Sequence, residues 1–173
     1  MKQVVQIRCK NNKKSQNISI GSSLSEIFFD FGLKMDFGPV SARVNNKVEG
    51  LDFRVYHNKD VEFLDLHTSS GLRAYTRTLF FILCKAASEL YPDKKMVIDI
   101  PVSNGYYCDL QLGRAITDED VERISRRMKE IIDAKIPIVR HECTTEDAIK
   151  MFTDLGDISK VKLLKSTGKL YTE

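Results

Sequence analysis

In the first third of the chain the spacing of apolar residues changes from that of a β-strand to that of a helix and back again. This limits the chain to folds that combine strands with a helix. Apolar and polar residues alternate in segments that predict β-strands: VVQIRCK (4–10), NISI (17–20), VSARVN (40–45), a short KVEGL (47–51) and VEFLDL (61–66). GSSLSEIFFDFGL (21–33) instead has helical spacing, with Ser23 and Glu26 as a capping box and Gly32 as its end. This third is therefore predicted to be α+β, with one helix packed on strands.

A polar, turn-rich segment, HTSSG (67–71), predicts a domain boundary, with one domain over 1–68 and a second over 72–173. The second domain is also expected to be α+β. Its predicted elements are a helix over 75–91, strands over 96–102 and 105–112 joined through Ser103 and Asn104, a helix from Thr117, a strand over 136–142 and a helix from Thr144 to Gly156. The basic end of the chain shows no clear stop, so the second domain is expected to be incomplete there.

The apolar run Leu79 to Cys84 is too short to span a bilayer, which needs about 20 residues. The hydrophobic content is 42%, the charged content is 29% and the formal charge is +3 over 173 residues. These values are typical of soluble domains and permit RNA as a partner without requiring it. Four cysteines stand singly, which favours a reducing cytoplasm. With the apolar run too short to span a bilayer, no membrane partner is expected.

The sequence contains no strong motif for nucleotide binding, metal binding or catalysis. Neither GxxxxGK followed by Ser or Thr nor GxGxxG is present, so this chain alone is not expected to transfer phosphate. His141 and Cys143 share a strand face in the prediction, but two ligands do not complete a zinc site, and such close neighbours rarely form a hydrolytic pair. We therefore expect no catalytic residue, no metal and no cofactor within these residues.

One predicted helix carries a group of cations. Arg123, Arg126, Arg127 and Lys129 follow Thr117 on faces other than the apolar one. Such a group is either a solvated helix face or an RNA surface, and the modest net charge favours the solvated face. The three arginines are candidate RNA contacts.

The first 68 residues resemble a TGS domain, the ubiquitin-like β-grasp module of threonyl-tRNA synthetases, certain GTPases and stringent-response enzymes. The resemblance rests on IGSSLSEIFFDFG, VSARVNNKVEGLDFRV and VEFLDL; Asn46 stands where the family usually has Gly. It implies a β-grasp fold.

The second region resembles the start of the additional domain of threonyl- and alanyl-tRNA synthetases, which removes wrongly attached amino acids. The resemblance rests on ELYP, IPVSNGYYCDL, TDEDVERISRRMKEII and TTEDAIKMF. In that family two histidines spaced HxxxH precede ELYP, and Arg77 and Phe81 occupy their positions here. The resemblance thus argues against editing by this chain.

A TGS unit with a histidine-free editing-like domain is similar to the N-terminal part of long bacterial uridine kinases. That resemblance implies a non-catalytic regulatory or ligand-binding region, with the P-loop kinase domain downstream as a partner in cis, and ATP and Mg²⁺ needed only there. The alternative is a tRNA-binding or editing module of a threonyl-tRNA synthetase-like protein. Either way, a small-molecule effector or RNA is the expected partner.

By analogy with the synthetase cleft, the candidate binding residues are Arg77 and Phe81 from the helix and Tyr107 and Asp109 from the hairpin. Tyr107 and Asp109 are two apart on a predicted strand and so share a face. The alternative is structural: Tyr107 is core and Asp109 pairs with Arg77.

Overall fold

The computed structural model describes residues 3–103, 105–139 and 141–172. It divides into two compact units, Met1–Asp133 and Ala134–Glu173, which we describe separately. Asn104 of the predicted hairpin turn and Arg140 of the predicted strand 136–142 lie outside the described residues.

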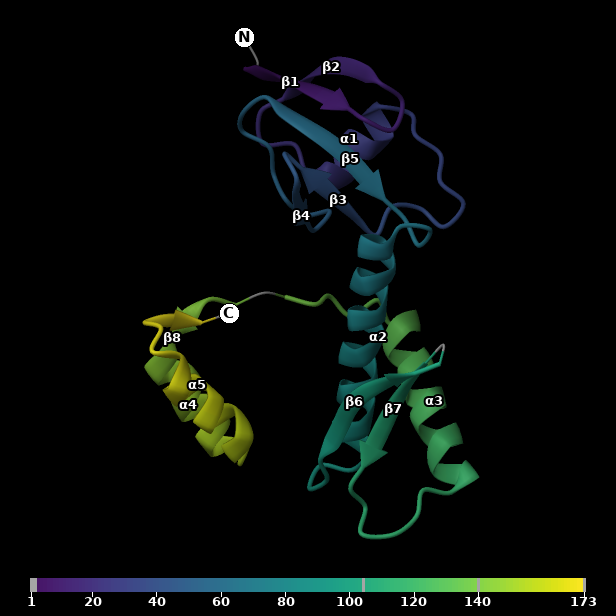
Figure 1. The fold of residues 1–173 in the computed structure, drawn as a ribbon, viewed down its shortest axis with the longest axis vertical. Helices are drawn as coiled ribbons and strands as arrows, with labels where there is room; N and C mark the ends of the chain where they lie inside the picture. The colour runs from purple at the N-terminus through teal and green to yellow at the C-terminus, as the bar shows by residue number, and fades with distance from the viewer. Residues whose placement is uncertain (1–2, 104, 140, 173) are drawn as a thin grey trace. The chain divides into compact units, whose positions relative to one another are not determined.

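The first unit begins with a mixed five-stranded sheet in the order β2-β1-β5-β3-β4 (Figure 1). Its elements are β1 (Val4–Cys9), β2 (Lys14–Ser19), α1 (Leu24–Asp30), β3 (Ser41–Val44), β4 (Lys47–Glu49) and β5 (Lys59–Leu64). Strands β1 and β5 are parallel and the other neighbours antiparallel. The chain is thus α+β, as predicted.

One face of this sheet is covered by α1. Strand β1 alternates exposed and buried residues, so Val5, Ile7 and Cys9 enter the core with Ile27 and Phe28 of α1. The predicted capping box is present: the Ser23 hydroxyl accepts from the Glu26 N–H, and the Glu26 carboxylate accepts from the Ser23 N–H at 2.7 Å. The local pattern therefore predicted this helix and its capping box correctly.

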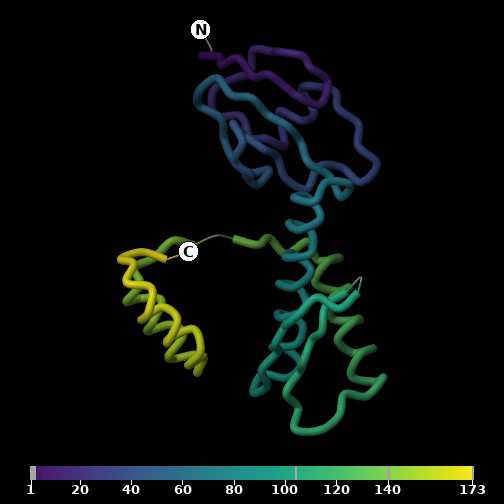
Figure 2. Tube along the Cα trace, viewed as in Figure 1, coloured from purple at the N-terminus to yellow at the C-terminus, as the bar shows by residue number. Residues whose placement is uncertain are grey.

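The same unit continues with α2 (Ser69–Leu90), the hairpin of β6 (Met96–Val102) and β7 (Gly105–Leu110), and α3 (Asp118–Asp133). The hairpin and α3 both pack on α2 (Figure 2). Their core is a second cluster: Ala86, Ala87, Leu110, Ile124 and Ile131. Of the helices described, none is long and apolar enough to cross a membrane.

The start of α2 corrects the prediction. Residues 69–71, predicted as part of a linker, form its first turn, because the Thr68 hydroxyl caps the helix by accepting from the Gly71 N–H at 3.0 Å. The two separate hydrophobic clusters agree with a division near residue 68, whereas the compact units divide after Asp133. The predicted domain limits stay a prediction.

The second unit holds β8 (Cys143–Thr144), α4 (Thr145–Asp154), α5 (Ile158–Thr167) and β9 (Tyr171–Thr172). Helix α4 begins after the Thr144 cap as predicted. The predicted strand over 136–142 is wrong, because its described residues form no strand. The basic end instead forms α5 and β9, and β9 pairs with β8.

Candidate nucleic-acid interface

One face of α2 carries cations and an aromatic ring. Arg73, Arg77 and Phe81 follow each other at four-residue spacing, which places them along one side of a helix. All three are exposed, and Phe81 keeps 66% of its surface accessible. A large exposed ring beside two exposed arginines gives this face both a stacking surface and hydrogen-bond donors for a ligand.

The positive charge of this face is not neutralised. Helix α2 has no acidic residue before Glu89, and Glu89 is held by Lys85 at 2.8 Å and by Arg127 at 2.8 Å. Arg73 donates to the Ser70 hydroxyl at 3.3 Å, and Arg77 makes no hydrogen bond or ion pair with another described residue. Arg77 therefore keeps all its donors for an anion, and Arg73 keeps those that Ser70 does not occupy.

An aromatic pair adjoins the cations. The rings of Phe80 and Tyr106 meet edge to face with centroids 4.8 Å apart, and Tyr106 remains 47% exposed. We call Arg73, Arg77, Phe80, Phe81 and Tyr106 the α2 surface. Arginines beside exposed rings bind single-stranded nucleic acid, because the cations attract phosphates while the rings stack on bases.

The hairpin residues of the predicted cleft lie differently. Tyr106 and Leu110 both contact the α2 layer, so the intervening Tyr107 and Asp109 belong to the other face of the hairpin. Tyr107 is 57% exposed, so it is not core. Asp109 is half-buried and forms no ion pair with Arg77 among the described residues. The structure groups Arg77 with Phe81, and Tyr107 with Asp109; a shared cleft stays a prediction.

The candidate RNA contacts of α3 are largely engaged within the protein. Arg127 bridges Glu89 at 2.8 Å and Glu130 at 2.6 Å, and these carboxylates raise its pKa. The Arg123 guanidinium lies 5.5 Å from the centre of the Tyr91 ring. Only Arg126 of the three is exposed with no such contact in the described part of the chain. The α2 surface is therefore the more available cationic surface.

A buried network missed by sequence reasoning joins α2 to α3. Asp120 is 3% exposed and accepts from Arg114 at 2.6 and 2.9 Å, from the Thr117 N–H at 3.0 Å and from the Tyr91 hydroxyl at 2.8 Å. Arg114 and then Thr117 lower the pKa of Asp120, whereas Asp120 and burial raise the pKa of Tyr91. The signal was the spacing T-x-x-D at 117–120, which is a capping-box spacing.

The structure offers no support for metal or thiol chemistry. The described residues contain no group of three His, Cys, Asp or Glu side chains able to hold a metal. His141 lies outside any strand, so the predicted face shared with Cys143 does not form. Burial raises the pKa of the half-buried Cys108, which disfavours a reactive thiolate.

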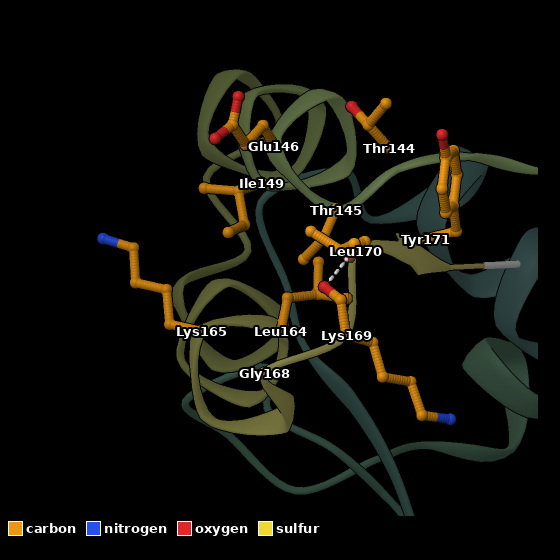
Figure 3. Close-up of a pocket in the computed structure, with 10 residues that line it drawn as sticks. All are labelled: Thr144, Thr145, Glu146, Ile149, Leu164, Lys165, Gly168, Lys169, Leu170 and Tyr171. Carbon is orange, nitrogen blue, oxygen red and sulfur yellow. Dashed lines mark hydrogen bonds between the residues drawn. The ribbon is translucent and has the colours of Figure 1, made fainter.

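The second unit contains a cavity of about 570 Å³ between α4 and α5. Figure 3 shows Ile149, Leu164 and Leu170 lining it between the helices, while the ammonium groups of Lys165 and Lys169 point away from them. The Thr145 hydroxyl closes one side by donating to the Lys169 carbonyl at 2.6 Å. The hollow is apolar inside and charged at its rim.

Curated relatives identify the lineage of this chain. A threonine–tRNA ligase of Natranaerobius thermophilus is 31% identical over 82% of the chain, and that of Aquifex aeolicus is 31% identical over 92%. The threonine–tRNA ligase of Syntrophomonas wolfei is 28% identical over 94%. The chain is homologous to the N-terminal part of threonine–tRNA ligases.

This similarity covers a minor part of each relative. The chain spans 22% of the Natranaerobius ligase and 25% of each of the other two. No protein-family model matches the chain. The similarity concerns an N-terminal region and does not extend to the rest of a ligase.

Proposed function

We propose that this chain is a tRNA-binding region of a threonine–tRNA ligase-like protein and that it does not itself hydrolyse mischarged tRNA. The observation that carries the proposal is the similarity to threonine–tRNA ligases over four-fifths or more of the chain. Their name states that they join threonine to tRNA. The mixed five-stranded sheet supports a TGS-type β-grasp domain, followed by an editing-like region.

The absence of hydrolysis is inferred from α2. The family resemblance assigns its two histidines to the positions of Arg77 and Phe81, and neither side chain can act as a general base near neutral pH. Both lie on the α2 surface, where a guanidinium can bind phosphate and a ring can stack. We infer that this face exchanged hydrolysis for binding.

A uridine kinase parent was the first expectation from the sequence. The relatives named above are all threonine–tRNA ligases, and none is a kinase. The comparisons therefore favour the alternative, a threonyl-tRNA synthetase-like module, and no observation favours ATP and Mg²⁺ as downstream requirements.

The test is binding of the whole chain to a threonine tRNA transcript at several salt concentrations. Replacing Arg73 and Arg77 by Gln is expected to weaken binding about tenfold or more and to lower the slope of log affinity against log salt by about 2. Arg126→Gln on α3 tests the competing candidate surface, and it is expected to weaken binding less than the α2 variant does. Equal binding by the α2 variant and the wild type contradicts the role of the α2 surface.

A deacylation assay tests the second half of the proposal. The chain is expected to release no amino acid from mischarged threonine tRNA above the uncatalysed rate. If the chain does hydrolyse this tRNA and mutation of Cys108 or His141 abolishes the hydrolysis, the proposal is contradicted, because the chain itself is then the catalyst.

A further inference from the structure

The outer face of the five-stranded sheet, opposite α1, carries two cross-strand cation–carboxylate positions that behave differently. Arg43 on β3 lies opposite Glu62 on β5, and the two side chains form an ion pair at 2.6 Å. Arg8 on β1 lies opposite Asp60 on β5, yet neither side chain forms an ion pair or hydrogen bond among the described residues. We call Arg43 and Glu62, which form an ion pair, the closed pair, and Arg8 and Asp60, which form none in the described structure, the open pair.

The open pair surrounds a hollow of about 240 Å³. Its lining is polar throughout: Gln6, Arg8, Ser15, Asn45, Asn58, Lys59 and Asp60. The side chains of Gln6, Arg8 and Asp60 share the outer face of the sheet, whereas Lys59 is registered with the buried Ile7 and belongs to the other face. The cation of the hollow is therefore Arg8, and no apolar residue of the described chain lines it. Charged groups that line a concavity without pairing are available to a ligand, and they require it to be polar.

Two asparagines fix the walls of this hollow. The Asn45 side-chain oxygen accepts from the Asp60 N–H at 2.9 Å, and the Asn45 N–H donates to the Asp60 carbonyl at 3.0 Å. The Asn58 side-chain oxygen accepts from the Gln6 N–H at 2.8 Å. Asn45 keeps a positive φ of 44°, which this bracing stabilises. The hollow is therefore pre-formed, which reduces the cost of binding.

We propose that this hollow binds a ribose phosphate, with Arg8 contacting the phosphate and Asp60 accepting a hydrogen bond from a ribose hydroxyl. An anion satisfies the Arg8 guanidinium, and a hydroxyl donor satisfies the Asp60 carboxylate. The side-chain amide and hydroxyl groups add donors and acceptors suited to a sugar. The site is separate from the α2 surface and does not depend on tRNA binding there.

The ribose phosphate has two sources, a free nucleotide or the backbone of RNA. Backbone amide signals of the whole chain, followed by NMR, report both. Uridine 3′-monophosphate or an oligouridylate is expected to shift signals of residues 6, 8, 15, 45 and 58–60. A response to the mononucleotide identifies a free ligand as sufficient, and a response to the oligonucleotide alone identifies RNA as the source.

Variants at the open pair define the contacts. Arg8→Gln is expected to weaken binding roughly tenfold, since a bond between charged groups is lost. The 2′-deoxy compound is expected to bind roughly threefold more weakly, and Asp60→Ala, which removes the acceptor, is expected to remove that difference. Arg43→Gln and Glu62→Gln, at the closed pair, are matched controls expected to leave affinity unchanged.

Any of the following results overturns the inference. The first is no signal change at millimolar ligand. The second is a change that Arg8→Gln leaves intact. The third is equal binding of ribose, deoxyribose and inorganic phosphate, or binding of free threonine alone. Arg73→Gln and Arg77→Gln do not change any residue of the hollow. Loss of ribose phosphate binding at the hollow and loss of tRNA binding at the α2 surface are therefore distinguishable outcomes.

Discussion

At the scale of single residues, Asp120 is the group on which the packing of α2 against α3 depends most. Its carboxylate is buried and accepts hydrogen bonds from three residues, so a neutral replacement leaves Arg114 and Tyr91 with a weaker acceptor. Asp120→Asn is expected to lower the thermal unfolding midpoint by roughly 5–10 °C, measured by circular dichroism. Asp118→Asn, exposed in the same turn, is the control and is expected to match the wild type.

Glu89 gives a prediction about pH. Arg127 and then Lys85 lower the pKa of Glu89 from 4.5 to about 2. Because the folded pKa is below the unfolded one, the ionised group stabilises the fold above pH 4.5 and loses this contribution as the pH falls towards 2. Glu89→Gln is expected to reduce the fall in free energy of unfolding over that interval, measured by urea titrations. Parallel curves for the variant and the wild type would contradict this, and Glu122→Gln serves as the exposed control.

These residues also show what the sequence could reveal. The bond between Ser23 and Glu26 was predictable because both partners lie within one helical turn. The Thr117 to Asp120 spacing is equally visible in the sequence, because both residues lie in one helical turn. The pairing of Asp120 with Arg114 depends on an irregular segment between β7 and α3, whose path no local pattern specifies.

At the scale of elements, the start of α2 is closely packed. A Cβ built on Gly71 would lie 1.9 Å from the Asp65 carbonyl oxygen, which is backbone and cannot move aside cheaply. Gly to Ala within a helix normally stabilises, but Gly71→Ala is expected to destabilise. Amide hydrogen exchange over residues 65–75 should accelerate at least tenfold, and Ser69→Ala should not change it. Unchanged exchange would contradict the close approach.

Element prediction succeeded where the signal was local. Alternation identified β1, and the cap residues Ser23 and Thr144 located the starts of α1 and α4. The strand predicted over 136–142 is absent from the described structure although Ile136, Ile138 and Val139 favour strands. A strand also needs a neighbouring strand to pair with. The described residues provide none, and Pro137 lacks the N–H for a ladder bond.

At the scale of the whole molecule, the two units differ in core size. The unit Ala134–Glu173 buries Ala148 alone among its described apolar residues and exposes nine larger ones: Ile136, Ile138, Val139, Met151, Leu155, Ile158, Leu163, Leu170 and Tyr171. So little burial gives little stability. Limited proteolysis is expected to remove this unit first and leave a resistant fragment ending near Asp133, identified by mass spectrometry. If the protease instead cuts first at a site before residue 133, the predicted difference in stability between the two units is contradicted.

The candidate sites belong to this scale as well, because each combines distant segments. The hollow at Arg8 joins β1 to residues about 50 positions later, and the α2 surface joins a helix to the Tyr106 hairpin. Sequence reasoning found Arg77 and Phe81 through a family resemblance. It missed Arg8 and Asp60, because their juxtaposition follows from the parallel pairing of β1 with β5.

The β6–β7 hairpin has a consequence for solubility. It is a two-stranded sheet whose outer edges are unpaired in the described structure, and Ile100, Val102 and Tyr107 lie exposed on it. Such edges invite aggregation by strand addition from another molecule. Pro101 interrupts the edge: it lacks an N–H, and the strand register shifts between Ile98 and Pro101. We therefore expect Pro101 to oppose strand addition at this edge, because it cannot donate a ladder hydrogen bond.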